Sequence, residues 1–263
     1  MTQSDLLHFW QQTVPEGWEN TCDHLYYARP DAEVRKVAVL FKITLQNLAE
    51  AADWGAQLII THEPLYPQYD GHMPPEESDP VVRAMHDRLI SSGIAVLRLH
   101  DHAHLHSPDF IHTGFLSRLG LPVQFVSPAE QLGIRQYNLA RAYTAREIAA
   151  LAAERLNMPH PRIAGNPDAP LTKVVLALGG VGNIGYEVLS RTDAELFITG
   201  ELNELGSAFY ANDAASLGLT KCFLVLGHCE SEQYGMEYLA AWLRDRLPAL
   251  DIRYFSSGPT YYY

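Results

Sequence analysis

An apolar strand that runs directly into a His-Glu pair and a proline is the feature that most constrains the fold. Residues Gln57–Thr61 are suited to a buried strand, His62 and Glu63 follow at once, and Pro64 stops the strand from continuing. Buried strands of this kind build parallel sheets, which carry their polar functional groups at the carboxyl ends of the strands. The segment therefore predicts an α/β protein with a site at one sheet edge.

Two later strands end in the same way. Ile94–Leu99 is followed by His100, His102 and His104, whose alternation predicts that all three lie on one side of an extended segment. Cys222–Leu226 is followed by a His-x-x-x-Glu spacing that places both side chains on one face if a helix starts there. Three strand ends thus supply imidazoles and carboxylates, the groups that bind divalent metals.

The two halves of the chain repeat one plan of strands separated by helices, which implies parallel pairing. Gly55–Glu63 and Asp193–Glu201 share Ala-x-Leu-x-Ile-Thr-x-Glu, which is more than strand composition. We interpret this as an internal duplication that gives two similar α/β lobes, residues 1–126 and 127–263. The other predicted strands are Val34–Phe41, Val174–Leu178 and Glu195–Thr199, and the predicted helices are Thr44–Trp54, Pro80–Ser92, Thr144–Leu156, Asn183–Ser190 and Asn203–Leu217.

Five residues at these strand ends form a candidate metal site between the lobes. Imidazole and carboxylate suit Zn, Fe, Mn or Ni, and this number of donors favours about two ions per subunit with an activated water. The alternative interpretation is that these are polar residues hydrogen-bonded within loops. The candidate ligands are His62, Glu63, His104, His228 and Glu232.

A glycine-rich turn follows the predicted strand Val174–Leu178. Gly180, Gly182 and Gly185 give a Gly-x-Gly-x-x-Gly pattern before a helix, and Glu201 ends the next strand. The pattern fits a dinucleotide site, a simpler phosphate contact or only a tight turn, and the next strand comes sooner than in most dinucleotide units. We take Gly180, Gly182 and Glu201 as candidate substrate-binding residues. Cys229 is better explained as a packed neighbour of His228 than as a nucleophile.

The composition of the chain limits the kinds of molecule that it is expected to bind. The net charge of −12 disfavours broad nucleic-acid binding, and no apolar run approaches the roughly 18 residues that span a bilayer. The amino terminus lacks the features of a signal peptide, and three scattered cysteines suit a reducing cytosol. These observations predict a cytoplasmic protein that acts on a small molecule, without a membrane or nucleic-acid partner.

Taken in order along the chain, the motifs resemble the Nif3-like family of dinuclear metal centre proteins, members of which are known as GTP cyclohydrolase I type 2. The resemblance covers nearly the whole chain. It is carried by Trp18-Glu19-Asn20, the strand end Gln57–Leu65, the segment His100–His104, the turn Gly179–Gly185, Ile198-Thr199-Gly200-Glu201 and Gly227-His228-x-x-x-Glu232.

The resemblance implies that the five candidate ligands are the metal ligands, with Glu63 at a family histidine position and His104 at a family aspartate position. It also implies a homohexamer. Our leading hypothesis is a metal-dependent hydrolase that acts on a phosphorylated or nucleotide-like molecule, with Glu230, His100 or His102 as acid or base. The rival hypotheses are a non-catalytic metal-binding assembly protein and a nucleotide-binding oxidoreductase that uses the glycine turn.

Overall fold

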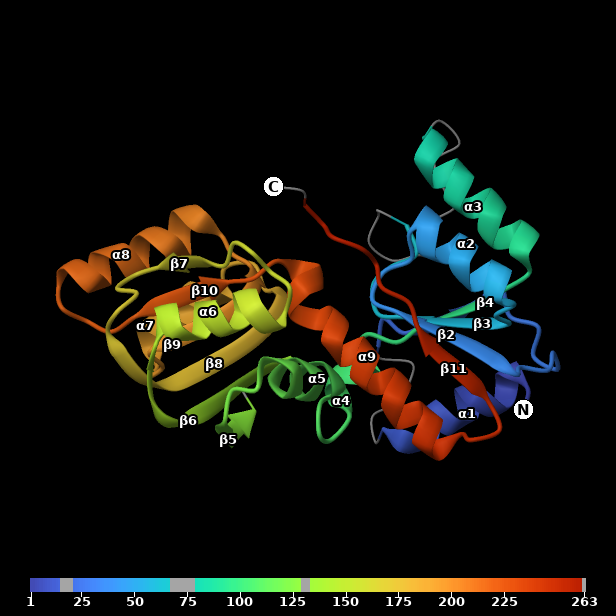
Figure 1. Ribbon diagram of the computed structural model, residues 1–263, viewed down its shortest axis with the longest axis horizontal. Coiled ribbons are helices and arrows are strands. Elements are labelled where there is room, and N and C mark those ends of the chain that lie inside the picture. The colour runs from blue at the N-terminus through green and yellow to red at the C-terminus, as the bar shows by residue number, and fades with distance from the viewer. Residues whose placement is uncertain (15–20, 67–78, 129–132, 262–263) are drawn as a thin grey trace. The chain divides into compact units, whose positions relative to one another are not determined.

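The computed structural model describes residues 1–14, 21–66, 79–128 and 133–261, which form two compact units (Figure 1). The first unit contains Met1–Phe110 and Gly235–Tyr263, and the second contains Ile111–Tyr234. The motif Trp18–Asn20 lies outside the described residues.

The first unit is built on a five-stranded sheet in the order β1-β4-β3-β2-β11. Strands β2, β3, β4 and β11 are parallel, and β1 is antiparallel to β4. In Figure 1, helices α2 and α3 cover one face, while α1 and the carboxyl-terminal part of α9 cover the other. The elements are α1 (Gln3–Thr13), β1 (His24–Tyr26), β2 (Lys36–Leu40), α2 (Leu45–Trp54), β3 (Leu58–Thr61), α3 (Pro80–Ser92), β4 (Ala95–Arg98), α4 (Asp101–Leu105), α9 (His228–Arg246) and β11 (Asp251–Tyr254).

The second unit is built on a six-stranded sheet in the order β5-β6-β8-β9-β10-β7. Strands β8, β9 and β10 are parallel, and β7 is antiparallel to β10. Residues of α7 and α8 complete the core on one face, through Leu189 and Ala211. The elements are α5 (Phe110–Leu119), β5 (Val123–Pro128), β6 (Ile134–Thr144), α6 (Ala145–Arg155), β7 (Arg162–Ala164), β8 (Pro170–Gly180), α7 (Ile184–Arg191), β9 (Leu196–Glu201), η2 (Glu204–Ala208), α8 (Phe209–Ser216) and β10 (Cys222–Val225).

The predicted duplication is present in the topology. The order β1-β4-β3-β2 in the first unit repeats as β7-β10-β9-β8 in the second, with the same strand directions. The prediction of an α/β fold with two similar lobes is therefore confirmed. In each unit, the parallel strands end at one edge, which positions the polar residues that follow them.

Local signals explain several boundaries. Thr44 and Thr144 each close a capping box at the start of a helix, because their hydroxyls accept the backbone N–H groups of Asn47 and Glu147. Gly55 ends α2 with a φ of 86°, in the left-handed region that glycine adopts without strain. These three residues behave as the sequence predicts.

Two sequence predictions do not match. The division falls at residue 110 instead of 126, and the chain returns to the first unit at Gly235, because β11 pairs with β2. The predicted helix Asn203–Leu217 is a π-helix, η2, followed by α8, since Asn203 caps η2 by accepting the N–H of Gly206. None of the described helices is both long and apolar enough to cross a membrane.

Aromatic packing joins the two ends of the first unit. Trp10 of α1 is fully buried, stacks on Trp242 of α9 at 5.9 Å between ring centroids, and meets the ring of Phe110 edge-on at 6.3 Å. Such a ring contributes through its large buried area and through these preferred geometries. Trp10 therefore ties the amino-terminal helix to the segment that returns at Gly235.

Trp10→Ala is expected to lower the free energy of unfolding by about 3–5 kcal/mol, because it leaves a large cavity between the rings. Urea unfolding followed by circular dichroism measures this change. His8→Ala, an exposed position on the same helix, is the control and should change stability by less than about 0.5 kcal/mol. Equal losses in both variants would contradict this packing role.

Candidate metal centre

The turn after β3 fixes His62 and Glu63 in the first unit. The backbone N–H groups of both residues donate to the Phe41 carbonyl, at 3.1 and 3.0 Å. His62 is completely buried, and Glu63 is half-buried. Burial lowers the pKa of the nearby Lys42 ammonium group, and the negative charge of Glu63 opposes that lowering. The strand end thus holds an imidazole and a carboxylate in a rigid turn.

Three imidazoles of the first unit form a cluster. The ligand nitrogens of His62, His100 and His104 all lie within 4.8 Å of one another. The rings of His62 and His100 are stacked at 4.4 Å between centroids, and His104 meets both at an angle, at 5.3 and 5.4 Å. Side chains that are this close can bring two ligands, His62 and His104, and an acid–base group, His100, to one cation.

The predicted extended alternation of His100, His102 and His104 is wrong. These residues enter the short helix α4, so His100 and His104 share one face and His102 turns away. The cause is Asp23, whose buried carboxylate accepts the backbone N–H groups of His100, Asp101 and His102 at 2.5–2.9 Å. An anion at these amides favours a helix start.

His102 is fully buried, and its Nδ1 lies 2.7 Å from Asp23 Oδ2. This contact gives His102 a positioning role at the start of α4. His100 remains partly exposed, and its Nδ1 contacts Asp101 at 2.8 Å. Burial acts to raise the pKa of Asp101, but hydrogen bonds from His100 and Cys22 outweigh it and hold that pKa well below its usual range. Of the two, only His100 is open to solvent.

Oxygen atoms orient the imidazoles of His62 and His104. His62 Nδ1 lies 3.2 Å from the Leu99 carbonyl, and His104 Nδ1 lies 3.2 Å from Asp109 Oδ2. A carbonyl only accepts, so His62 carries its proton on Nδ1, and Nε2 presents a lone pair. Metal-binding histidines commonly donate the N–H of their other ring nitrogen to an oxygen atom in this way.

The second unit carries a separate pair at the start of α9. His228 Nδ1 lies 2.7 Å from Glu201 Oε1, and His228 Nε2 lies 3.2 Å from Glu232 Oε2. Glu232 is 2% exposed. With the proton on Nδ1, the lone pair of Nε2 faces a carboxylate oxygen, an arrangement that requires a cation or a proton between the two atoms. Two donors bound to one ion at about 2.1 Å lie roughly 3 Å apart, as these atoms do.

Because Gly179 has no side chain, there is space in front of the His228–Glu232 pair. Gly179 has a φ of 71°, and a Cβ atom there would lie 2.5 Å from Glu232 Oε1 and 2.9 Å from His228 Nε2. Gly180 is the next residue, where a Cβ would lie 3.4 Å from the His228 ring, and Gly182 has nothing within 4 Å of such an atom. At Gly185, a Cβ would lie 2.7 Å from Phe223, so that glycine allows close packing of α7 on the sheet.

The structure places the other predicted site residues in different surroundings. Glu201, a candidate substrate-binding residue, contacts His228, and the Glu230 carboxylate lies against Gly227. The sequence analysis missed the roles of Asp23 and Asp109. Asp23 gives no motif signal because its partners are 77–79 residues away, whereas the short spacing of His104 and Asp109 could have indicated their contact.

Comparison with known proteins identifies the family. Residues 1–259 match the family described as Duf34/NIF3 (NGG1p interacting factor 3). The chain belongs to the Duf34/NIF3 family. A related protein, the GTP cyclohydrolase 1 type 2 homolog of Streptomyces coelicolor, is 29% identical over 202 residues, which are 73% of this chain and 68% of that protein.

Solved structures share the fold of this Duf34/NIF3 chain. The Staphylococcus aureus protein SA1388 superimposes with a TM-score of 0.77 at 18% identity, over 100% of this chain and 99% of that one. The Bacillus cereus protein related to NIF3 superimposes with a TM-score of 0.76 at 13% identity, with the same coverage. At these identities the structures support the architecture alone.

Gly179→Ala is expected to reduce metal binding and stability together, because the new methyl group contacts His228 and Glu232 and the residue is strained at positive φ. Gly182→Ala is the matched control, since it has a φ of 59° but no neighbour within 4 Å. Metal content by elemental mass spectrometry and thermal melting measure the two effects. Equal metal loss in both variants would mean that backbone strain, and not the contact, is responsible.

Glu201→Ala should lower metal affinity roughly 10- to 100-fold, because His228 loses the carboxylate that orients it. Glu201→Gln keeps an acceptor for Nδ1–H and should recover part of this affinity. Glu204→Ala, another exposed carboxylate of the second unit, is the control. Competition with a chromophoric chelator gives the affinities, and an unchanged value for Glu201→Ala would exclude the orienting role.

Proposed function

We propose that the protein binds divalent transition-metal ions and uses them to hydrolyse a small phosphorylated or nucleotide-like molecule. The ligands in this proposal are His62, Glu63 and His104 from the first unit, together with His228 and Glu232 from the second. The observation that carries the proposal is the contact of His228 Nε2 with Glu232 Oε2 at 3.2 Å, in which the carboxylate is buried and the imidazole is partly exposed.

The donor chemistry fits such an ion. Three imidazoles and two carboxylates suit Zn, Fe, Mn or Ni, and this number of donors favours about two ions per subunit. Cys22 lies near His100, but burial raises the pKa of its thiol to about 12, so it stays protonated at neutral pH. We therefore assign the site to nitrogen and oxygen ligands.

A divalent ion, when bound, supplies a Lewis acid and lowers the pKa of a coordinated water. The protein has to contribute acid–base groups and substrate contacts. His100 is the best-supported acid or base, since it is partly exposed, belongs to the imidazole cluster and is held through Nδ1 by Asp101. Glu230 stays a second candidate. The name of the Streptomyces coelicolor relative supports a nucleotide-like substrate.

Metal content is the direct test. Protein purified without added metal or chelator should carry about two ions per chain, by elemental mass spectrometry. His62→Ala and His228→Ala should each lose the metal if both units contribute ligands. His8→Ala and His160→Ala, exposed histidines in the first and second units, serve as controls and should keep it. Failure to bind Zn, Mn or Fe after reconstitution would overturn the proposal.

Turnover separates catalysis from binding. Metal-loaded protein should hydrolyse GTP or a member of a phosphoester panel, and His100→Ala should slow the reaction by about 10²–10⁴-fold while keeping its metal. Metal without turnover on any substrate would favour the alternative, a non-catalytic metal-binding homo-oligomer. Light scattering tests the homohexamer that the family resemblance implies.

A further inference from the structure

Arg98 ends β4, immediately before the segment that carries His100. Its side chain is buried, at 7% exposure, and its Nε has no hydrogen-bond partner. Within the described ranges, no ion pair or side-chain hydrogen bond involves this guanidinium group. Arginine stays charged at every relevant pH, and a buried charge without a partner is strongly unfavourable. Among the described residues, the buried Nε group therefore has no acceptor, which suits an anion bound from solution.

Lys42 adds a second cation close by. Lys42 follows β2 and Arg98 ends β4, two strands that flank β3 in the same sheet. Burial lowers the pKa of Lys42 to about 8; the charge of Glu63 opposes this lowering, and the charge of Arg98 adds to it. The lysine is still mostly charged at neutral pH. Its Nζ donates to the carbonyls of Pro64 and Tyr66, so its position is fixed. Two cations held together match the charge of a phosphate dianion.

The carboxylates of this region are already engaged. Asp23 accepts three backbone N–H groups and contacts the His102 ring. Asp101 accepts the backbone N–H of Cys22 and contacts His100. Glu63, the remaining acid that acts on Lys42, is a proposed metal ligand. These acids therefore already have other partners.

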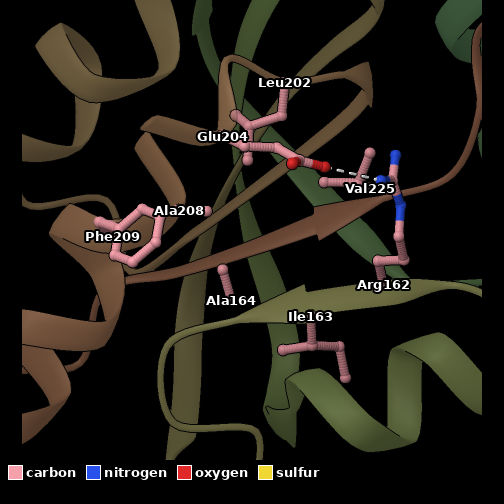
Figure 2. A pocket seen from close by; sticks show the side chains of 8 residues that line it. All are labelled: Arg162, Ile163, Ala164, Leu202, Glu204, Ala208, Phe209 and Val225. Atoms are coloured by element: carbon pink, nitrogen blue, oxygen red, sulfur yellow. Dashed lines mark hydrogen bonds and ion pairs between the residues drawn. The ribbon is translucent and has the colours of Figure 1, made fainter. Parts of the chain in front are cut away.

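The duplication provides an internal comparison. Thr61 pairs with Arg98 across β3 and β4, and Thr199 pairs with Val225 across β9 and β10, so Arg98 and Val225 are equivalent positions. Val225 lines a cavity of about 180 Å³ together with Arg162 of β7 and Leu202 (Figure 2). The fold thus tolerates an apolar residue at this strand end, and in the second unit a cavity lies beside it. A cation at the same corner of the first unit points to a ligand.

We propose that Arg98, assisted by Lys42, binds the phosphate group of the substrate at the sheet edge that carries the His62, His100 and His104 cluster. A guanidinium group presents two parallel N–H donors that match phosphate oxygens. The term substrate rests on the proposed function, whereas the phosphate site itself does not. Arg98 is thereby a substrate-binding residue that positions the reacting bond beside the metal ligands.

Inorganic phosphate is the probe, used on the full-length protein after metal removal so that no metal–phosphate contact contributes. Calorimetry should detect binding to wild-type protein, roughly 10- to 100-fold weaker binding to Arg98→Met, and intermediate binding to Arg98→Lys. Arg83→Met, an exposed arginine of α3, is the control and should bind as wild type does. Lys42→Met should also weaken binding, and it tests the site if Arg98→Met does not fold.

Thermal melting distinguishes a ligand site from a structural arginine. Without phosphate, Arg98→Met should melt no lower than wild type, because it removes a buried charge that has no ion-pair partner. Phosphate should raise the melting temperature of wild type but not of this variant. A lower melting temperature that phosphate does not affect, or no phosphate binding by wild type, would overturn the inference.

Metal analysis keeps the two proposals apart. Arg98→Met should retain the wild-type metal content, since the substitution leaves the proposed ligands in place. Phosphate binding that depends on Arg98 in a protein that holds no metal would support this site and reject the hydrolase. Normal metal content with phosphate binding that ignores Arg98 would reject this site alone.

Discussion

The buried carboxylate of Asp23 is the contact on which the first half of the candidate site depends. It gathers three successive backbone N–H groups, those of residues 100–102, and so makes the chain turn from β4 directly into α4. Without such an acceptor the amides would be buried without partners, which is costly. The turn brings His100 and His104 to one face and removes His102 from it. A positioning residue far away in sequence therefore decides which histidines meet.

The duplication explains why the two units contribute different ligands. His62 in the first unit and Gly200 in the second occupy equivalent positions, each directly after a threonine that pairs with a neighbouring strand, Thr61 with β2 and Thr199 with β8. A Cβ at Gly200 would lie 2.7 Å from the Gly179 carbonyl and 2.8 Å from His228 Cα. The start of α9 thus fills the space that a histidine would need. The second unit offers His228 instead, from the next strand end.

Much of this arrangement follows from the sequence. The strand ends, the capping threonines and the repeat Ala-x-Leu-x-Ile-Thr-x-Glu are local patterns, and local patterns are visible in one chain. The residues that orient the histidines cannot be recognised from local patterns, because Asp23 and Glu201 act across long sequence separations. The helix at His100–His104 was missed for the same reason, since its cause lies in Asp23. The division at residue 110 depends on a pairing between β2 and β11 that no local signal announces.

The position of β11 has a consequence for how the chain is made. The second unit is continuous from Ile111 to Tyr234. The sheet of the first unit is complete only when Asp251–Tyr254 pair with Lys36–Val39. During synthesis, β2 is therefore an open sheet edge until residues 251–254 have left the ribosome, and open edges invite wrong pairing. The unit that is made first, with His62 and His104, is the one that closes last.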